Sequence, residues 1–412
     1  MKFLRADLLR GNTLVTTTAK FAILLANFLI VVVTSHLWGT SGRGEIALVI
    51  ANISIINILS NIFCGNTITF HASRDNRDFL FLSAFIGSLV LSLCGALVFS
   101  LYIGFGYFKD LFIISFLSSL TGTFSMYWLG VRKITLYNIL TFLNPVLILL
   151  YLIVFYFIFN LTSINACFYA YYSGLGTLLV IGILSFRREA PFRFPAISFK
   201  IISKIVSYGF PNEASYFIQF LNYRLSYFFI AKWLGLSQLG VFSIAVSCAE
   251  AVWVISKSMS TVHYSNVVNT TDQKVSISET TTYAAQSFWI SLLFMGLIVI
   301  IPKTVFEYTF GPAFGSVKTY LIYLMPGIIA IAVSNLYGHY FAGIGNLKIL
   351  IRKSAIGLIA SLILLLILTK KYYLNGVCFS LNISYLLSSL YLFISFRNER
   401  KKFNVSDIPV VD

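Results

Sequence analysis

Four ionisable side chains lie within long apolar stretches, where a charge is costly and is therefore a candidate for function. These residues are Lys20, Glu213, Arg224 and Glu250. Basic groups at such a depth can bind an anionic ligand, and a guanidinium can donate two parallel hydrogen bonds to phosphate oxygens. A carboxylate can bind and release a cation. The chemistry predicted is the binding of an anionic group, coupled to movement of H⁺ or Na⁺, with no bound cofactor and no metal.

Aromatic residues accompany two of these charges. Glu213 and Arg224 are eleven positions apart, which places them within about 20° of each other around an α-helix. Tyr216, Tyr223 and Tyr227 lie on or beside the same face. This spacing predicts one helix face that carries both charges and aromatic rings.

The depth of the charges within the apolar stretches suggests two ion pairs. Lys20 and Glu213 are both expected in the inner third of the membrane. Arg224 and Glu250 are expected roughly 12 Å and 15 Å from its outer side, from the helical rise per residue. Lys20–Glu213 and Arg224–Glu250 are therefore the predicted pairs, and a purely structural role for each pair stays open. Asn27 extends a polar stripe from Lys20 along the first stretch.

The elements that must position these groups are membrane-spanning helices. Of the 412 residues, 58% are apolar and 11% are charged, whereas about 25% are charged in ordinary soluble domains. Apolar runs of about 20 residues have the length at which a helix crosses a bilayer. In lipid a helix satisfies its own backbone hydrogen bonds, and the runs lack the period-two alternation of a barrel strand. We therefore predict an all-α integral membrane protein with about twelve transmembrane helices.

The predicted spans are divided equally between the two halves of the chain. Those of the first half are 13–35, 44–64, 79–103, 111–130, 138–159 and 164–186. Those of the second half are 207–231, 239–259, 284–301, 319–341, 349–369 and 375–396. An even number of spans places both termini on the same side of the membrane.

The distribution of Lys and Arg predicts the orientation. With the N-terminus inside, 21 of the 30 basic residues flank the inner ends of the spans, 7 flank the outer ends, and Lys20 and Arg224 lie within spans. Basic residues are retained on the cytoplasmic side, so both termini are predicted to be cytoplasmic. The same bias explains the net charge of +16 through contact with an anionic leaflet, so no nucleic-acid partner is expected.

Several classes of function are excluded by what the sequence lacks. It contains no phosphate-binding GxxxxGK[ST] loop, and its five cysteines and four histidines are dispersed without metal-site spacing. No connection between the predicted spans is long enough to hold a separate catalytic domain. We therefore expect a protein that is not an enzyme.

A repeated motif relates the two halves of the chain. Gly39-x-Ser41-x-x-Gly44 follows the first span, and Gly235-x-Ser237-x-x-Gly240 follows the seventh. A weaker match joins residues 128–133 to residues 343–348. Because each half has six spans, the repeats run in the same direction, which is a transporter architecture. We predict two parallel six-helix bundles (6+6) around a central cavity: residues 1–190 and 207–396, joined by a cytoplasmic linker at 191–206 and followed by a cytoplasmic tail at 397–412.

At this point the sequence resembles a known family. The 6+6 arrangement, together with Tyr-Gly-Phe-Pro at 208–211, Asn-Tyr-Arg-Leu at 222–225 and Gly-Val-Phe-Ser at 240–243, is similar to the multidrug/oligosaccharidyl-lipid/polysaccharide exporter superfamily. Within it the chain looks most like the O-antigen flippases of Gram-negative bacteria. Relatives often have an aspartate where this chain has Ser226, so no carboxylate role is transferred to that position.

The resemblance implies a function and a location. It implies translocation of undecaprenyl-diphosphate-linked oligosaccharide units across the bacterial inner membrane by ion-coupled alternating access. Arg224 and Lys20 would bind the diphosphate, and Glu213 and Glu250 would couple transport to H⁺ or Na⁺. The residues expected to contact the glycan are Tyr216, Tyr223, Tyr227 and Asn27. The implied partners are the lipid-linked oligosaccharide, the bilayer, and the glycan polymerase and chain-length proteins of the same pathway.

Two alternatives remain open at the level of sequence. A drug or metabolite exporter of the same fold would use the same helices, because a fold does not fix a substrate. A pocket for organic cations should however be acidic, and half of the four charges within the predicted spans are basic. A membrane-embedded glycan polymerase should carry a large outward loop, and the longest loop here, about 257–284, is predicted to face the cytoplasm.

Overall fold

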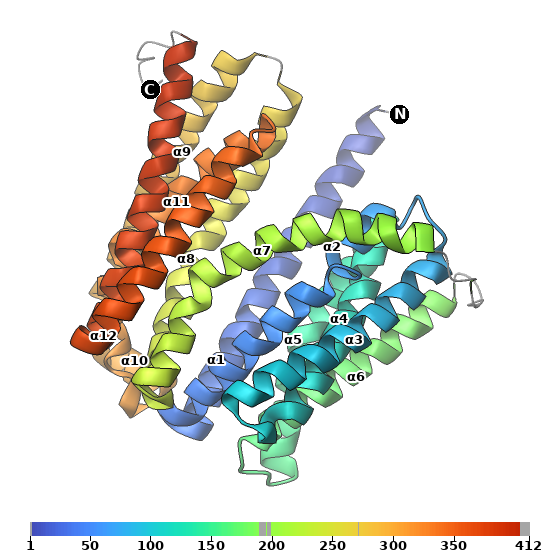
Figure 1. The fold of residues 1–412 in the computed structure, drawn as a ribbon, viewed down its shortest axis with the longest axis vertical. Coiled ribbons are helices and arrows are strands. Elements are labelled where there is room, and N and C mark those ends of the chain that lie inside the picture. Colours follow the sequence, from blue (N-terminus) through green and yellow to red (C-terminus); the bar gives the residue numbers. More distant parts are fainter. Residues whose placement is uncertain (1, 189–194, 196–198, 271, 404–412) are drawn as a thin grey trace. The chain divides into compact units, whose positions relative to one another are not determined.

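A computed structural model describes residues 2–188, 195, 199–270 and 272–403, and these residues form helices and short connections without a β-strand (Figure 1). The predicted all-α fold class is confirmed for this part of the chain. The chain divides into two compact units. Unit 1 contains Met1–Trp38 and Val49–Phe217, and unit 2 contains Gly39–Leu48 and Ile218–Asp412. Each unit is described separately below.

The helices before the predicted linker are α1 to α6. Their bounds are α1 Lys2–Ser60, α2 Gly65–His71, α3 Arg77–Ile103, α4 Phe108–Gly130, α5 Ile134–Ile153 and α6 Asn165–Arg187. Two short turns, η1 Phe105–Tyr107 and η2 Val154–Ile158, flank α4 and α5.

The helices after the linker are α7 to α12. Their bounds are α7 Phe199–Trp233, α8 Leu236–Asn269, α9 Gln273–Ile300, α10 Lys303–Phe310, α11 Val317–Gly343 and α12 Leu347–Lys402. A short turn, η3 Pro312–Phe314, precedes α11.

Two of these helices each contain a pair of predicted spans. Helix α1 bends at Gly39, with φ 61° and ψ −162°, and α12 bends at Tyr373, with φ 52° and ψ −137°. Both residues have the positive φ that glycine adopts freely and that tyrosine adopts only at a cost. The first and second spans, and the eleventh and twelfth, are thus joined by a kink rather than by a loop.

The lengths of the helices agree with a membrane protein. Within the described residues, nine helices are long and apolar enough to cross a bilayer, and α1 and α12 are among them. Together these nine contain eleven of the twelve predicted spans. The remaining span, 207–231, lies in α7, which contains Glu213 and Arg224 and is not among the nine. The crossing by α7, and with it the total of twelve crossings, therefore stays a prediction.

Unit 1 is held together by helix packing around an aromatic core. α4 packs against α2, α3, α5 and α6. The ring centroid of Phe81 lies 4.2 Å from that of Phe186 and 4.9 Å from that of Phe124. Trp128 on α4 is almost wholly buried. Large rings at helix crossings supply much of the buried apolar area in such a core.

Unit 2 is organised around α11. This helix packs against α8, α9 and α12, and its residues Tyr337, Tyr340 and Phe341 lie in the core of the unit together with Leu392 and Phe396 of α12. Because α11 contacts three neighbours, its buried residues occur on most of its circumference, and its side chains are apolar almost all round, as expected for an interior helix.

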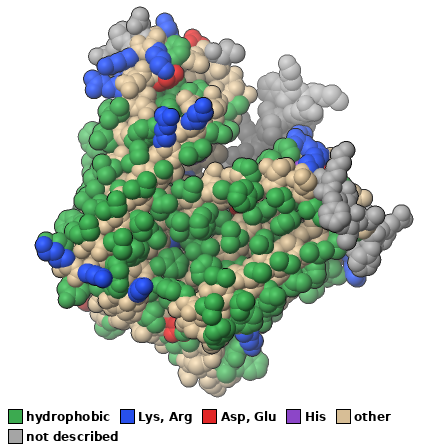
Figure 2. Space-filling view, viewed as in Figure 1, with side chains coloured by type: hydrophobic (Ala, Val, Ile, Leu, Met, Phe, Trp, Pro, Cys, Tyr) green, Lys and Arg blue, Asp and Glu red, His purple; other side chains and the backbone are tan. Residues whose placement is uncertain are grey.

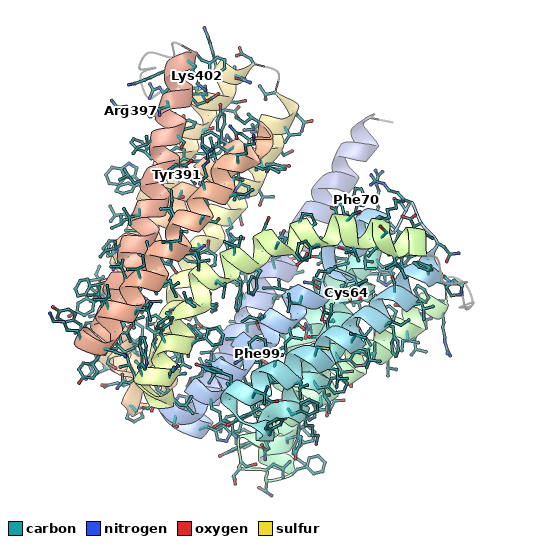
Figure 3. All side chains as sticks on the ribbon, in the orientation of Figure 1. Cys64, Phe70, Phe99, Tyr391, Arg397 and Lys402 are labelled. Carbon is teal, nitrogen blue, oxygen red and sulfur yellow. The ribbon has the colours of Figure 1, made fainter. Side chains whose placement is uncertain are left out.

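The surface of the helices is apolar along their length and basic at their ends. Figure 2 shows hydrophobic side chains covering the visible sides of the helices, with Lys and Arg gathered toward helix ends. Arg397 and Lys402 lie near the end of α12 (Figure 3), whose last turn contains Arg400, Lys401 and Lys402. An apolar belt with basic margins is the surface that a bilayer requires.

The two compact units do not test the predicted domain limits, which stay predictions. The boundary falls between Phe217 and Ile218, within α7, and Gly39–Leu48 of α1 belongs to unit 2. Helix α7 begins at Phe199, so the end of the predicted linker 191–206 is helical. Residues 191–194 and 196–198 lie outside the described residues, as do 404–412 of the predicted tail. The helical stretch 199–217 belongs to unit 1, and only residues 199–206 of it were predicted as linker.

The two copies of the repeated glycine motif contact each other within unit 2. A Cβ placed on Gly44 would lie 1.8 Å from the carbonyl oxygen of Leu236, and one on Gly240 would lie 1.9 Å from that of Thr40. The hydroxyl oxygens of Thr40 and Ser237 are 2.7 Å apart. Leu236 is the repeat counterpart of Thr40, and Gly240 is that of Gly44, so the contact is reciprocal. Only glycine permits backbones to approach so closely.

Candidate functional site

The predicted pair Arg224–Glu250 is formed in unit 2. Arg224 on α7 donates from both terminal nitrogens to the two carboxylate oxygens of Glu250 on α8, over 2.6 Å and 2.8 Å. Both side chains are mostly buried, at 24% and 28% exposed. The geometry is the two-pronged arrangement in which an arginine and a carboxylate bind most strongly. The two opposite charges cancel, so the pair carries no net charge.

Aromatic rings surround this pair. The Arg224 guanidinium carbon lies 5.1 Å from the ring centroid of Tyr227, within the range of a cation–π contact. On the adjacent turn, the Tyr223 centroid lies 5.1 Å from that of Trp253 and 6.2 Å from that of Tyr385. Trp253 is held in place because its indole N–H donates to the Ile328 carbonyl over 3.1 Å. The structure thus places Tyr223 and Tyr227 beside Arg224, as the helix face predicted.

Lys353 is a candidate residue that the charge count missed. It lies in the second turn of α12 and lines a cavity of about 20 Å³ together with Asn222, Tyr223, Tyr385 and other polar side chains. That volume holds about one water molecule. Among the residues that the structure describes, no carboxylate pairs with Lys353. Lys353 lies within the predicted span 349–369, but the count of basic residues that predicted the orientation assigned it to the cytoplasmic flank of that span.

Asn222 forms another wall of the cavity. Its side-chain nitrogen donates to the Ser354 carbonyl over 3.1 Å, which ties α7 to α12. Its side-chain oxygen is buried and has no hydrogen-bond partner within the described residues. A buried amide oxygen without a partner is costly, so the cavity offers an acceptor as well as the ammonium group of Lys353.

The predicted residues of unit 1 are arranged differently. Glu213 is buried, and its carboxylate accepts a hydrogen bond from the Asn212 side chain over 2.8 Å. The Tyr216 hydroxyl accepts from Asn66 over 3.3 Å. Lys20 and Asn27 are exposed on α1, and the Asn27 side chain donates to the Ile23 carbonyl of its own helix. Within the described residues, the predicted ion pair between Lys20 and Glu213 is not formed: Lys20 is exposed, whereas Glu213 is buried.

The eight predicted site residues are therefore divided between the units. Unit 2 brings together four of them, namely Arg224, Glu250, Tyr223 and Tyr227. Unit 1 contains the other four, namely Lys20, Asn27, Glu213 and Tyr216. A single cavity lined by both sets, and the substrate and ion roles of the individual residues, stay predictions.

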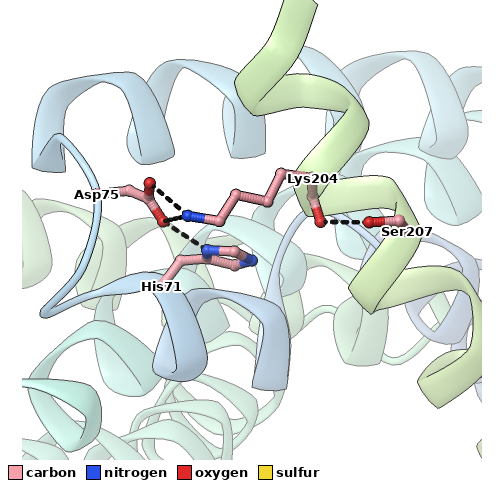
Figure 4. Close-up of polar contacts among 4 residues, drawn as sticks. All are labelled: His71, Asp75, Lys204 and Ser207. Atoms are coloured by element: carbon pink, nitrogen blue, oxygen red, sulfur yellow. Dashed lines mark hydrogen bonds and ion pairs between the residues drawn. The ribbon is translucent and has the colours of Figure 1, made fainter.

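A second polar cluster fastens the first part of α7 to unit 1 (Figure 4). Lys204 donates to both oxygens of Asp75, over 2.9 Å and 3.1 Å, and the Asp75 carboxylate lies 2.6 Å from the Nδ1 of His71. Tyr208 stacks on Phe70 with ring centroids 4.1 Å apart. Burial raises the pKa of the Asp75 carboxyl, but the hydrogen bonds from Lys204 and His71 outweigh it, and the pKa lies below its usual value.

Comparison with solved structures shows which fold this geometry belongs to. An inward-facing multidrug resistance MATE family transporter of the MOP superfamily matches with a TM-score of 0.73 and 15% identity, covering 93% of this chain and 96% of that chain. The lipid II flippase MurJ, in an inward closed conformation, matches with a TM-score of 0.76 and 13% identity, covering 93% and 87%. The MATE multidrug transporter DinF-BH matches with a TM-score of 0.67 and 16% identity, covering 97% of both chains.

These matches extend over nearly the whole chain. No family model and no curated protein matches the sequence. At identities below 20%, the likeness establishes the fold. The chain has the fold of MATE transporters and of MurJ. With its long apolar helices, it is a multi-pass membrane protein.

Proposed function

We propose that the chain is a flippase of the multidrug/oligosaccharidyl-lipid/polysaccharide exporter superfamily. Its proposed cargo is an undecaprenyl-diphosphate-linked oligosaccharide unit of O-antigen type. It acts by alternating access in the bacterial inner membrane, with both termini in the cytoplasm. Its role is transport and not catalysis. The fold shared with MurJ and with MATE transporters supports the transport class.

The observation that carries the choice of cargo is the charge inside unit 2. Arg224 is matched by Glu250, which leaves the ammonium group of Lys353 as an excess positive charge beside the polar cavity. An uncompensated cation in a membrane-embedded unit favours an anionic ligand such as a diphosphate. Tyr223 and Tyr385 line the same cavity.

The proposed transport cycle assigns a different task to each group. Lys353 and Arg224 attract the diphosphate, and Arg224 exchanges one or both of its bonds to Glu250 for bonds to phosphate oxygens. Glu250 is then free to bind H⁺ or Na⁺, which couples the ion to the cargo. Lys20 and Glu213 of unit 1 act at the cytoplasmic side, on entry of the headgroup. The glycan polymerase and chain-length proteins of the same pathway would receive the product.

The proposal is tested by complementation of a strain that lacks the gene. That strain should accumulate lipid-linked single repeat units inside the cell and lose surface glycan, and the wild-type chain should reverse both effects. Arg224→Ala should fail to restore surface glycan, and Arg224→Lys should restore part of it, because the charge survives without the two-pronged geometry. Normal surface glycan with Arg224→Ala would refute the role of this residue.

A double variant separates transport from folding. Removing one partner of a buried ion pair leaves the other charge uncompensated, whereas replacing both with apolar residues of similar size is often tolerated. Arg224→Met combined with Glu250→Met should therefore give a folded protein at normal abundance that still fails to transport. Full transport by this double variant would show that the pair is only structural.

A drug or metabolite exporter is the second candidate, because two of the three matching structures described above are multidrug transporters. In that case deletion of the gene should sensitise cells to organic cations and leave surface glycan unchanged. Unchanged sensitivity to organic cations together with loss of surface glycan supports the flippase.

A further inference from the structure

We propose that unit 1 binds an anionic phospholipid of the inner leaflet in a groove between α3, α4 and α6. The site is separate from the cavity of unit 2 and does not depend on the cargo that the protein carries. It consists of a cavity of about 460 Å³ with apolar walls and one basic residue.

The walls of the groove suit a hydrocarbon chain. The floor is formed by buried side chains of α4 and α6, including Phe124 and Phe186, and the open side is bordered by Phe85 and Ile183, which are 46% and 37% exposed. Thr123 is the one uncharged polar residue of the lining, and its hydroxyl donates to the Ser119 carbonyl over 2.9 Å. The hydroxyl proton of this residue is therefore already engaged within its own helix.

A basic group lies at one end of the groove. Leu179, Ile183 and Arg187 follow one another at intervals of four residues along α6, so Arg187 lies one turn beyond the apolar wall on the same face. From Leu179 to Arg187 the helix rises about 12 Å. Arg187 is exposed, and no carboxylate of the described residues pairs with it.

A second guanidinium lies near this end, but its charge is already matched. The Arg77 guanidinium carbon lies 4.2 Å from the ring centroid of Phe186, which forms part of the floor, and Arg77 is paired with the Asp78 carboxylate over 2.8 Å. Arg187 is therefore the basic group of the groove. The distribution of Lys and Arg predicts that the start of α3 and the end of α6 lie on the cytoplasmic side. An apolar groove about 12 Å long with the Arg187 cation at its cytoplasmic end fits the first part of one acyl chain of a phospholipid, with the phosphate at Arg187. This charge favours an anionic lipid over a zwitterionic one.

The test measures lipid binding to the purified full-length chain by native mass spectrometry. The delipidated protein is titrated with palmitoyl-oleoyl phosphatidylglycerol and, separately, with the phosphatidylcholine of the same chains. We expect phosphatidylglycerol to bind about fivefold more tightly, which is the effect of one basic residue close to an anionic lipid. Arg187→Gln should abolish this preference.

Two further variants decide whether the groove is the site. Arg188→Gln removes the same charge from the next, exposed residue, which does not line the groove, and it should leave the preference unchanged. Ile183→Trp narrows the mouth and should weaken binding of both lipids. Equal losses with Arg187→Gln and Arg188→Gln, or unaltered binding with Ile183→Trp, would overturn the proposal. Displacement of bound phosphatidylglycerol by an equal concentration of undecaprenyl phosphate would also overturn it, because the groove would then hold a polyprenyl chain.

Discussion

Substitution of Gly44 by alanine tests the close contact between the two glycine motifs. The added Cβ would lie 1.8 Å from the Leu236 carbonyl oxygen and 2.9 Å from the Gly240 nitrogen. Both of these atoms belong to the backbone, so a change of rotamer cannot relieve the clash. The segment that contains Gly44 and the start of α8 must therefore separate by more than about 1 Å, since ordinary non-bonded carbon contacts begin near 3.5 Å.

The expected magnitude follows from two opposing effects. Alanine favours a helix over glycine by about 1 kcal/mol, whereas forcing extra atoms into a packed contact costs about 1–3 kcal/mol. The separation also removes close backbone packing, on which helix association in membranes depends. We expect Gly44→Ala to lower the free energy of unfolding by about 2 kcal/mol, and Gly240→Ala to do the same because the contact is reciprocal.

The chain offers matched controls for this experiment. A Cβ on Gly122 of α4 or Gly296 of α9 would meet no atom within 4 Å, so alanine at either position should be neutral or stabilising by up to about 1 kcal/mol. The assay is unfolding of the purified protein in detergent, followed by the loss of monodisperse protein with temperature. If Gly44→Ala unfolds at the same temperature as Gly296→Ala, the described contact does not exist in the protein.

Three further predictions follow from other sites. Lys353→Met should reduce surface glycan several-fold without lowering protein abundance, whereas Lys348→Met, at an exposed residue near the start of α12, should not. Asp75→Asn should destabilise the protein at neutral pH. Because the pKa of the Asp75 carboxyl is lowered in the folded protein, the stabilisation is present above about pH 4 and is lost as pH falls through the lowered value, so acid unfolding curves of variant and wild type should converge there. Tyr373→Gly should raise the unfolding free energy by about 1 kcal/mol, because the left-handed conformation costs a non-glycine residue that amount.

Much of the fold could be predicted because the bilayer imposes a simple rule on sequence. Long apolar runs gave the helices, and the spans 79–103, 111–130 and 164–186 lie within a few residues of α3, α4 and α6. Hydropathy did not reveal that α8 and α9 continue well beyond their apolar parts, to Asn269 and from Gln273. Helix outside the hydrocarbon region needs no apolar side chains, so composition cannot mark its end.

The candidate site was predictable only where one helix carried its residues. The spacing on α7 predicted Tyr223 and Tyr227 beside Arg224, and depth correctly paired Arg224 with Glu250. The ion pair between Lys20 and Glu213, predicted from their equal depth in the membrane, is not formed in the described part of the chain. Equal depth does not decide which way a side chain points. Lys353 was missed because the count of basic residues assigned it to the cytoplasmic flank, although it lies within the predicted span 349–369. Its polar neighbours Asn222 and Tyr223 come from α7, more than a hundred residues away, so no further signal was present in the sequence.

The glycine crossing also limits how the two copies of the motif can evolve. Thr40 of the first copy faces Gly240 of the second, and the equivalent residue Leu236 of the second copy faces Gly44 of the first. A reciprocal contact of this kind is called isologous and is typical of a two-fold symmetric dimer. A single chain reproduces that arrangement with two copies of one motif. A bulky substitution in either copy disturbs the same crossing, and a compensating change has to occur in the other copy. The two sequences are therefore constrained as a pair, although they are encoded almost two hundred residues apart.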